Sequence, residues 1–166
     1  MGSMSILWRL FLSAAVLVAL AAGPREVSAQ ARKKAPRCLT AADVKTEQLV
    51  RHGIFLREAG NRCDEWVAGT RQKWLDFDGR FGTRLKAQTD RRIRMFQRAF
   101  RDDAVKVMTY FDGRLVTYYR HYPLSEVYCR DVDDLLTEVN RRGWGGFTKQ
   151  AEVIQNEVHL DYKVCQ

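Results

Sequence analysis

The chain has 166 residues, of which 46% are hydrophobic, and its 28 Lys and Arg against 20 Asp and Glu give it a net charge of +8. This length is enough for one domain with a hydrophobic core. The sequence contains no internal repeat and no low-complexity segment, which excludes repeat and low-complexity architectures. The excess of positive charge predicts an anionic partner.

Residues 1–29 are typical of a secretory signal peptide. Arg9 supplies a positive charge, and residues 10–22 form an apolar run that is too short to span a membrane. Short side chains then stand at the −3 and −1 positions before a cleavage site that follows Ala29. We therefore expect a periplasmic or secreted protein, cleaved after Ala29. An uncleaved N-terminal anchor is the alternative.

Export narrows the expected partners. Residues 30–37 read as a flexible basic tail, and residues 38–166 as a single helical domain. Outside the cytoplasm, a basic domain meets acidic proteins, anionic envelope polymers and lipid head groups. We expect a protein or an anionic envelope polymer as the partner, with peripheral membrane contact as a further option, and no nucleic acid.

The four cysteines lie beyond the predicted signal peptide. An even number in an oxidising compartment predicts two disulfides. We favour Cys38–Cys165, which ties the two ends of the domain together, and Cys63–Cys129, while the other two connectivities stay open. The cysteine spacings match no zinc site and no C-x-x-C motif, so we expect neither a metal nor a cofactor.

The first predicted elements are helices. Thr40 with Asp43 resembles a capping box, followed by apolar residues at helical spacing up to Gly60. A second helix is expected over residues 63–77, ended by the glycines within 78–82.

The segment from Ile93 to Tyr122 supports two interpretations. Its apolar residues recur with an average period of 3.6, which indicates a helix. Asp112 and Gly113, however, stand between β-branched and aromatic runs, which is typical of a hairpin. We favour a helix with a bend at Gly113. An α+β fold with a hairpin at 105–119 is the alternative.

The last predicted elements follow Pro123. Ser125 or Asp131 begins a helix, residues 143–147 form a turn, and Thr148 begins a final helix. Together these elements predict a mainly α fold, a four- or five-helix bundle stapled by two disulfides.

A basic stripe is the first candidate site. On a helical wheel its arginines lie opposite Ile93 and Phe96, and arginine binds carboxylates and phosphates in bidentate fashion. The alternative is a solvated face, partly neutralised by the i,i+4 pairs of Asp90 with Arg94 and of Arg98 with Asp102. The stripe consists of Arg84, Arg91, Arg94, Arg98 and Arg101.

Aromatic residues form the other candidates. Trp144, in a glycine-rich turn, either anchors a partner or folds back over the end of the bundle. A second group either lines a pocket for a sugar or an apolar ligand or belongs to the core. Its members are Tyr110, Phe111, Tyr118, Tyr119 and Tyr122, with His121.

Catalytic motifs are missing from the sequence. His52, His121 and His159 are widely separated, and there is no His-Glu-x-x-His, Gly-x-Ser-x-Gly or phosphate-binding glycine loop. We therefore favour an exported envelope binding or adaptor protein, acting through surface contacts with an acidic partner or polymer, over an enzyme. The alternative is a small exported hydrolase with a site near His121 or His159.

Overall fold

The computed structural model describes residues 38–165, and in that range the chain is mainly helical, as predicted. The predicted signal peptide and basic tail lie outside the described residues. No described helix is both long and apolar enough to cross a bilayer. In chain order the elements are α2 (Ala41–Cys63), α3 (Thr70–Phe100), the 3-10 turn η1 (Arg101–Asp103), α4 (Ala104–His121), α5 (Glu126–Ala151), the 3-10 turn η2 (Glu152–Ile154) and α6 (Gln155–Asp161).

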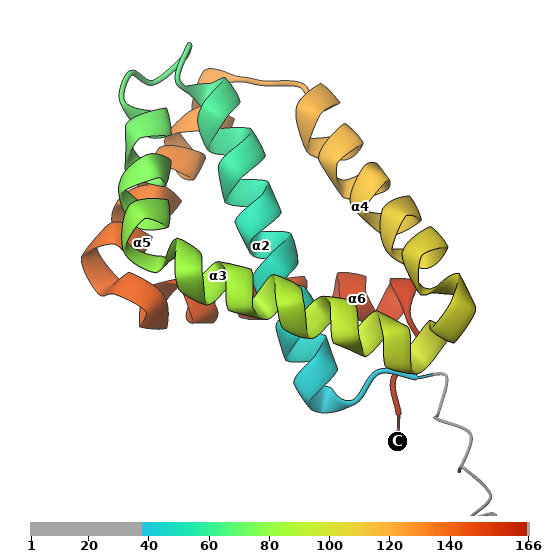
Figure 1. Ribbon diagram of the computed structural model, residues 1–166. Coiled ribbons are helices and arrows are strands. Elements are labelled where there is room, and N and C mark those ends of the chain that lie inside the picture. The colour runs from blue at the N-terminus through green and yellow to red at the C-terminus, as the bar shows by residue number, and fades with distance from the viewer. Residues whose placement is uncertain (1–37, 166) are drawn as a thin grey trace, which may run out of the picture. The chain divides into compact units, whose positions relative to one another are not determined.

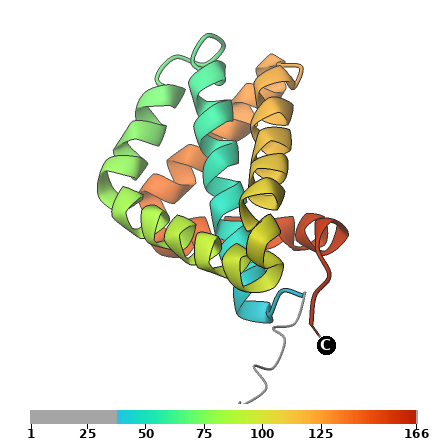
Figure 2. The ribbon, with the colours of Figure 1, turned by 45° about the vertical axis from the view of Figure 1, so that its right-hand side comes forward.

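Helix α2 lies at the centre of these elements, with α3 and α4 on either side of it in Figure 2. It begins in the predicted capping box: Thr40 Oγ1 accepts from the Asp43 amide at 3.3 Å, and Asp43 Oδ2 accepts from the Thr40 amide at 2.9 Å. Because α2 contacts α3, α4, α5 and α6, it is buried on most sides, and polar residues such as Glu47 and Arg51 are enclosed with the apolar ones.

The predicted end of the second helix is wrong. Helix α2 continues past Gly60 to Cys63, and α3 begins at Thr70 and runs through the glycines of 78–82 to Phe100. In Figure 1 it changes direction along its length without ending. Glycine weakens a helix by only about 1 kcal/mol. The burial of Trp74 and Phe77 in the core outweighs that cost.

Helix α4 settles the choice between helix and hairpin in favour of the helix. It runs from Ala104 to His121 without a break at Gly113, so the bend expected there is wrong. The glycine is exposed and has open space around it, so no tertiary contact forces a turn. The break lies earlier, at Arg101, where φ is 53°. The described residues contain no strand, only an isolated parallel bridge between Leu39 and Val164.

The expected turn at 143–147 is a kink inside α5. Ser125 caps the helix, since its side chain accepts from the Tyr128 amide, and Gly143 alone leaves helical geometry, with φ 64° and ψ −150°. Thr148 does not begin a helix, because the chain remains helical through Ala151 and α6 starts at Gln155.

Two disulfides staple the bundle, and both favoured pairings are confirmed. Cys63–Cys129 joins the end of α2 to α5 within the core. Cys38–Cys165 joins the two ends of the domain, where Leu39 also exchanges backbone hydrogen bonds of 2.8 Å with Lys163 and Cys165.

Candidate functional site

A cluster of buried charges joins α2 to α3. Glu47 is fully buried, and Arg51 and Arg92 are 1% and 2% exposed. Arg51 Nε donates to Glu47 Oε1 at 3.0 Å, and Arg92 Nε donates to Glu47 Oε2 at 2.5 Å. The Tyr162 hydroxyl donates to Glu47 Oε1 at 3.2 Å. One carboxylate therefore receives donors from three other side chains.

Further ion pairs extend this cluster to α4 and α6. Arg92 Nη1 lies 2.6 Å from Asp112 Oδ1, and Arg51 Nη2 lies 2.7 Å from Asp161 Oδ2. Arg114 Nη1 lies 3.4 Å from the other oxygen of Asp161. The ion cluster, as we call these six residues, is therefore balanced, and it links four helices: Glu47, Arg51, Arg92, Asp112, Arg114 and Asp161.

Arg92 stays charged despite its burial. Burial alone lowers the pKa of Arg92, but the charge and the hydrogen bonds of Glu47 outweigh it and raise that pKa above its ordinary value. Burial also raises the pKa of the Tyr162 hydroxyl, and the charge of Glu47 adds to the effect. With each charge paired, the cluster is a structural crosslink. The cluster was not predicted from the sequence, although the i,i+4 spacing of Glu47 and Arg51 was a local signal.

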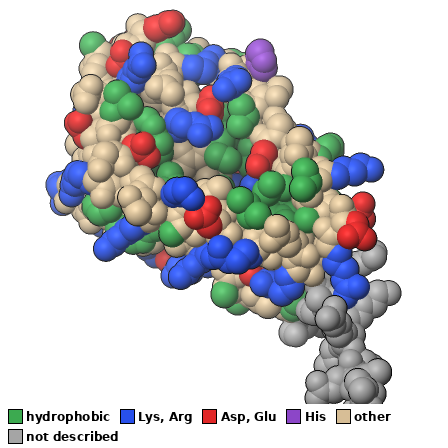
Figure 3. All heavy atoms as spheres, in the orientation of Figure 1, with side chains coloured by type: hydrophobic (Ala, Val, Ile, Leu, Met, Phe, Trp, Pro, Cys, Tyr) green, Lys and Arg blue, Asp and Glu red, His purple; other side chains and the backbone are tan. Residues whose placement is uncertain are grey.

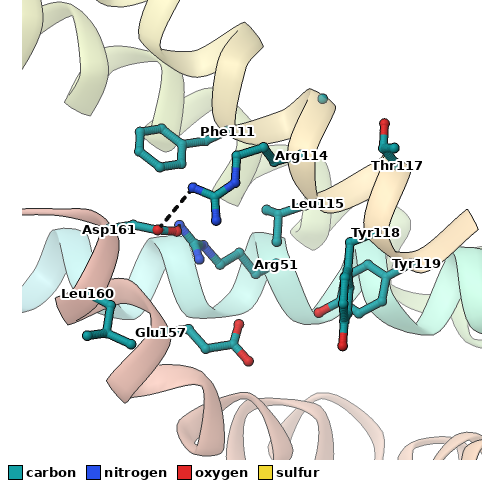
Figure 4. Close-up of a pocket in the computed structure, with 11 residues that line it drawn as sticks. Arg51, Phe111, Arg114, Leu115, Thr117, Tyr118, Tyr119, Glu157, Leu160 and Asp161 are labelled. Carbon is teal, nitrogen blue, oxygen red and sulfur yellow. Dashed lines mark hydrogen bonds and ion pairs between the residues drawn. The ribbon is translucent and has the colours of Figure 1, made fainter. Parts of the chain in front are cut away.

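A groove of about 690 Å³ borders the ion cluster between α4 and α6 (Figure 4). Arg51, Arg114 and Asp161 form its charged end, while Tyr118 and Tyr119 from α4 lie at the other. We call it the ionic groove. Both arginines pair with Asp161, which offsets one of their two positive charges, and Arg51 also pairs with the buried Glu47.

A second groove, of about 350 Å³, shares Tyr118, Tyr119 and Glu157 with the first. Its wall contains five aromatic rings that follow one another in space, and the centroid of each ring lies within 5.4 Å of the centroid of the next. We call it the tyrosine groove, after the rings Phe55, Tyr119, Tyr118, Tyr122 and Tyr128.

Four of the six aromatic residues singled out from the sequence line one or both of the two grooves. Tyr122 lines the tyrosine groove, and Phe111 lines the ionic groove. Tyr110 and His121 are exposed and line neither. His159, around which the hydrolase alternative also places its site, is likewise exposed and outside both grooves.

His52 is the one histidine that lines a groove. It is 3% exposed, and its Nε2 lies 3.0 Å from Gln150 Oε1. Burial lowers the pKa of His52 to about 4, although the hydrogen bond with Gln150 opposes this. The imidazole is therefore uncharged near neutral pH.

The predicted basic stripe is exposed. Its five arginines, from Arg84 to Arg101, are all accessible, and Figure 3 shows Lys and Arg side chains gathered along α3. We call these five residues the basic face. On the opposite side of α3 lie Arg92, Met95, Phe96 and Ala99, all buried.

The neutralising pairs expected within the basic face do not form. Asp90 pairs with Lys86 at 2.8 Å instead of with Arg94, and Arg98 pairs with Asp43 at 2.5 Å instead of with Asp102. Asp43 gains Arg98 because it already stands at the start of α2, beside α3. Among the described residues, Arg91 and Arg94 have no carboxylate within 4.0 Å.

Trp144 is half-buried at the kink of α5. Its ring centroid lies 5.0 Å from that of Phe147 and 6.3 Å from that of Phe81. The guanidinium of Arg84 lies over the Trp144 ring, 6.0 Å from its centroid. The tryptophan thus packs against the end of the bundle and holds one arginine of the basic face.

No family model, curated protein or solved structure matches the chain. The function is therefore inferred from the chemistry of the basic face and the two grooves.

Proposed function

We propose that the chain is an exported binding or adaptor protein of the cell envelope, cleaved after Ala29, that docks an acidic partner protein or anionic polymer on its basic face. The observation that carries the proposal is the exposure of four arginines along α3 and of Arg101 directly after it, of which only Arg98 has a described carboxylate within 4.0 Å.

The basic face suits an extended anionic surface. Four of its five side chains stand on a helix that is anchored by buried residues, including Phe96 and the charge-paired Arg92, so the spacing of these arginines is maintained. Guanidinium groups bind carboxylates and phosphates through two parallel hydrogen bonds. Several such contacts in a row favour a partner with repeated negative charges.

Export is supported by the disulfides. Two bridges with no free cysteine among the described residues suit an oxidising compartment, where disulfides form and persist. The signal-like residues 1–29 agree with this compartment.

The test is recovery of partners from an envelope extract by the tagged mature chain. Arg91→Glu with Arg94→Glu reverses the charge of two of the four arginines in the basic face that pair with no described carboxylate. Arg71→Glu with Arg141→Glu changes the net charge equally at exposed arginines elsewhere on the surface. We expect recovery to fall with the first pair and to persist with the second. Equal recovery with both pairs would rule out the basic face as the docking surface.

A further inference from the structure

The wall of the tyrosine groove is a run of aromatic rings. Phe55 and Tyr119 lie 5.3 Å apart between ring centroids, Tyr119 and Tyr118 5.2 Å, and Tyr118 and Tyr122 5.4 Å. Tyr128 continues the run at 4.9 Å from Tyr122. The rings are tilted against one another by between 36° and 71°, so they turn different faces and edges to the groove.

The charge of this groove is opposite to that of the whole chain. The chain has 28 Lys and Arg, yet none of those within the described residues lines the tyrosine groove. Glu157 is its one carboxylate, and His52 is neutral. The lining of the groove therefore carries one formal negative charge and no formal positive charge.

Glu157 stands where a bound cation would meet both a carboxylate and aromatic rings. It is exposed on α6, and its side chain extends toward the side on which Tyr118 and Tyr119 lie (Figure 4). Within the described residues it forms no ion pair. Burial is the main cause that raises the pKa of Tyr119, and the negative charge of Glu157 raises it further. Glu157 is therefore close enough to interact electrostatically with this tyrosine.

We propose that the tyrosine groove binds a small organic cation, an alkylated ammonium group of the choline type. Such a cation has no N–H to donate, so it is bound by the faces of aromatic rings and by a nearby carboxylate. The volume of about 350 Å³ suits a small ligand. The same head group occurs free in solution and on phosphatidylcholine, so either source satisfies this chemistry.

The test is calorimetric titration of the mature chain with choline and with 3,3-dimethyl-1-butanol, which has the same shape without the charge. We expect choline to bind and the alcohol to bind at least about tenfold more weakly. Equal binding of the two compounds, no binding of choline, or binding of glucose in its place overturns the proposal.

Variants locate the site. Glu157→Gln and Tyr118→Leu are each expected to weaken choline binding about tenfold, whereas Tyr118→Phe, which keeps the ring, retains it. Tyr110→Leu is the matched control, because Tyr110 is an exposed tyrosine of α4 outside this groove. Circular dichroism checks that each variant folds. Unchanged binding in folded Glu157→Gln and Tyr118→Leu places the cation elsewhere and overturns the assignment.

A vesicle experiment separates the two sources. Sedimentation with phosphatidylcholine vesicles that is competed by free choline indicates that the groove also accepts the lipid head group. Binding of free choline without such sedimentation assigns the site to a free cation. Because neither measurement depends on Arg91 or Arg94, the double variant Arg91→Glu and Arg94→Glu keeps its choline affinity even if the basic face proves to have no partner.

Discussion

Arg51 and Arg92 are buried, and both donate to the carboxylate of Glu47. Removing one partner of a buried charge pair leaves the other charges uncompensated in a medium that solvates them poorly. Glu47→Gln is therefore expected to lower the free energy of unfolding by about 3–5 kcal/mol, measured by urea denaturation. Asp90→Asn, in the exposed pair with Lys86, is the control and should cost less than about 1 kcal/mol. A Glu47→Gln protein as stable as the wild type would contradict the role given to the ion cluster.

His52 makes stability depend on pH in a defined range. Its pKa falls from 6.5 to about 4 on folding. Between these two values the unfolded chain binds a proton at this site and the folded chain does not, so stability decreases as the pH is lowered. The expected loss is about 3 kcal/mol from pH 6.5 to 4.

Comparison with His52→Gln isolates this effect. The variant does not titrate, so its free energy of unfolding should change less over the same range. Folding lowers the pKa values of the Asp43 and Glu58 carboxyls from 3.8 and 4.5, so the stability that these groups contribute is lost mainly below pH 4.5, outside the window from pH 6.5 to 5. If the free energy of unfolding of the wild type and of His52→Gln changes equally between pH 6.5 and 5, the inference that His52 is buried as a neutral imidazole is wrong.

Single residues were predictable where one local rule applies. The Thr40 cap and the exposure of the five arginines follow from spacing alone, and both are confirmed. The burial of Arg92 was not predictable, because a charged residue next to the exposed Arg91 is expected to be exposed as well. Ile93, the first residue of the apolar period, is only partly buried, and Arg92 lies in the interior because Glu47 on α2 faces it.

At the scale of elements, α5 depends on one glycine. Gly143 has φ 64° and ψ −150°, a region that side-chain-bearing residues avoid, and an added Cβ would lie 3.1 Å from Phe81 Cζ. Gly143→Ala is expected to cost about 1–3 kcal/mol. Gly145→Ala, where nothing lies within 4 Å, should be neutral or stabilise by up to about 1 kcal/mol. Thermal unfolding of both variants measures the difference, and equal midpoints would contradict a required kink.

Element types were more predictable than element ends. The 3.6 period from Ile93 to Tyr122 identified helix correctly, since a sustained period reflects a buried side. The glycines of 78–82 and Gly113 misled the boundaries because intrinsic propensity is weak beside tertiary packing. The break that does occur, at Arg101, carries no glycine or proline and gave no local signal.

At the scale of the whole molecule, the fold brings together what is distant in the sequence. The tyrosine groove combines His52 and Phe55 of α2 with Tyr118 of α4 and Glu157 of α6. A linear pattern cannot reveal such a site, although the cluster of tyrosines on one helix was a partial signal. The disulfide pairing was predictable, because Cys38 and Cys165 lie at the two ends of the domain and a bridge between them ties those ends together.

The basic face also belongs to the scale of the whole molecule, since its affinity for a partner depends on the charge of that partner and on the salt concentration. The most direct measurement is the affinity for a soluble polyglutamate peptide as a function of salt concentration, compared between the wild type, Arg91→Glu with Arg94→Glu, and the control Arg71→Glu with Arg141→Glu. Screening should weaken wild-type binding steeply as salt rises. We predict that the first double variant loses most of the affinity and of the salt dependence, whereas the control keeps both. Equal losses in the two variants would show that net charge alone attracts the peptide, and would contradict a docking surface on α3.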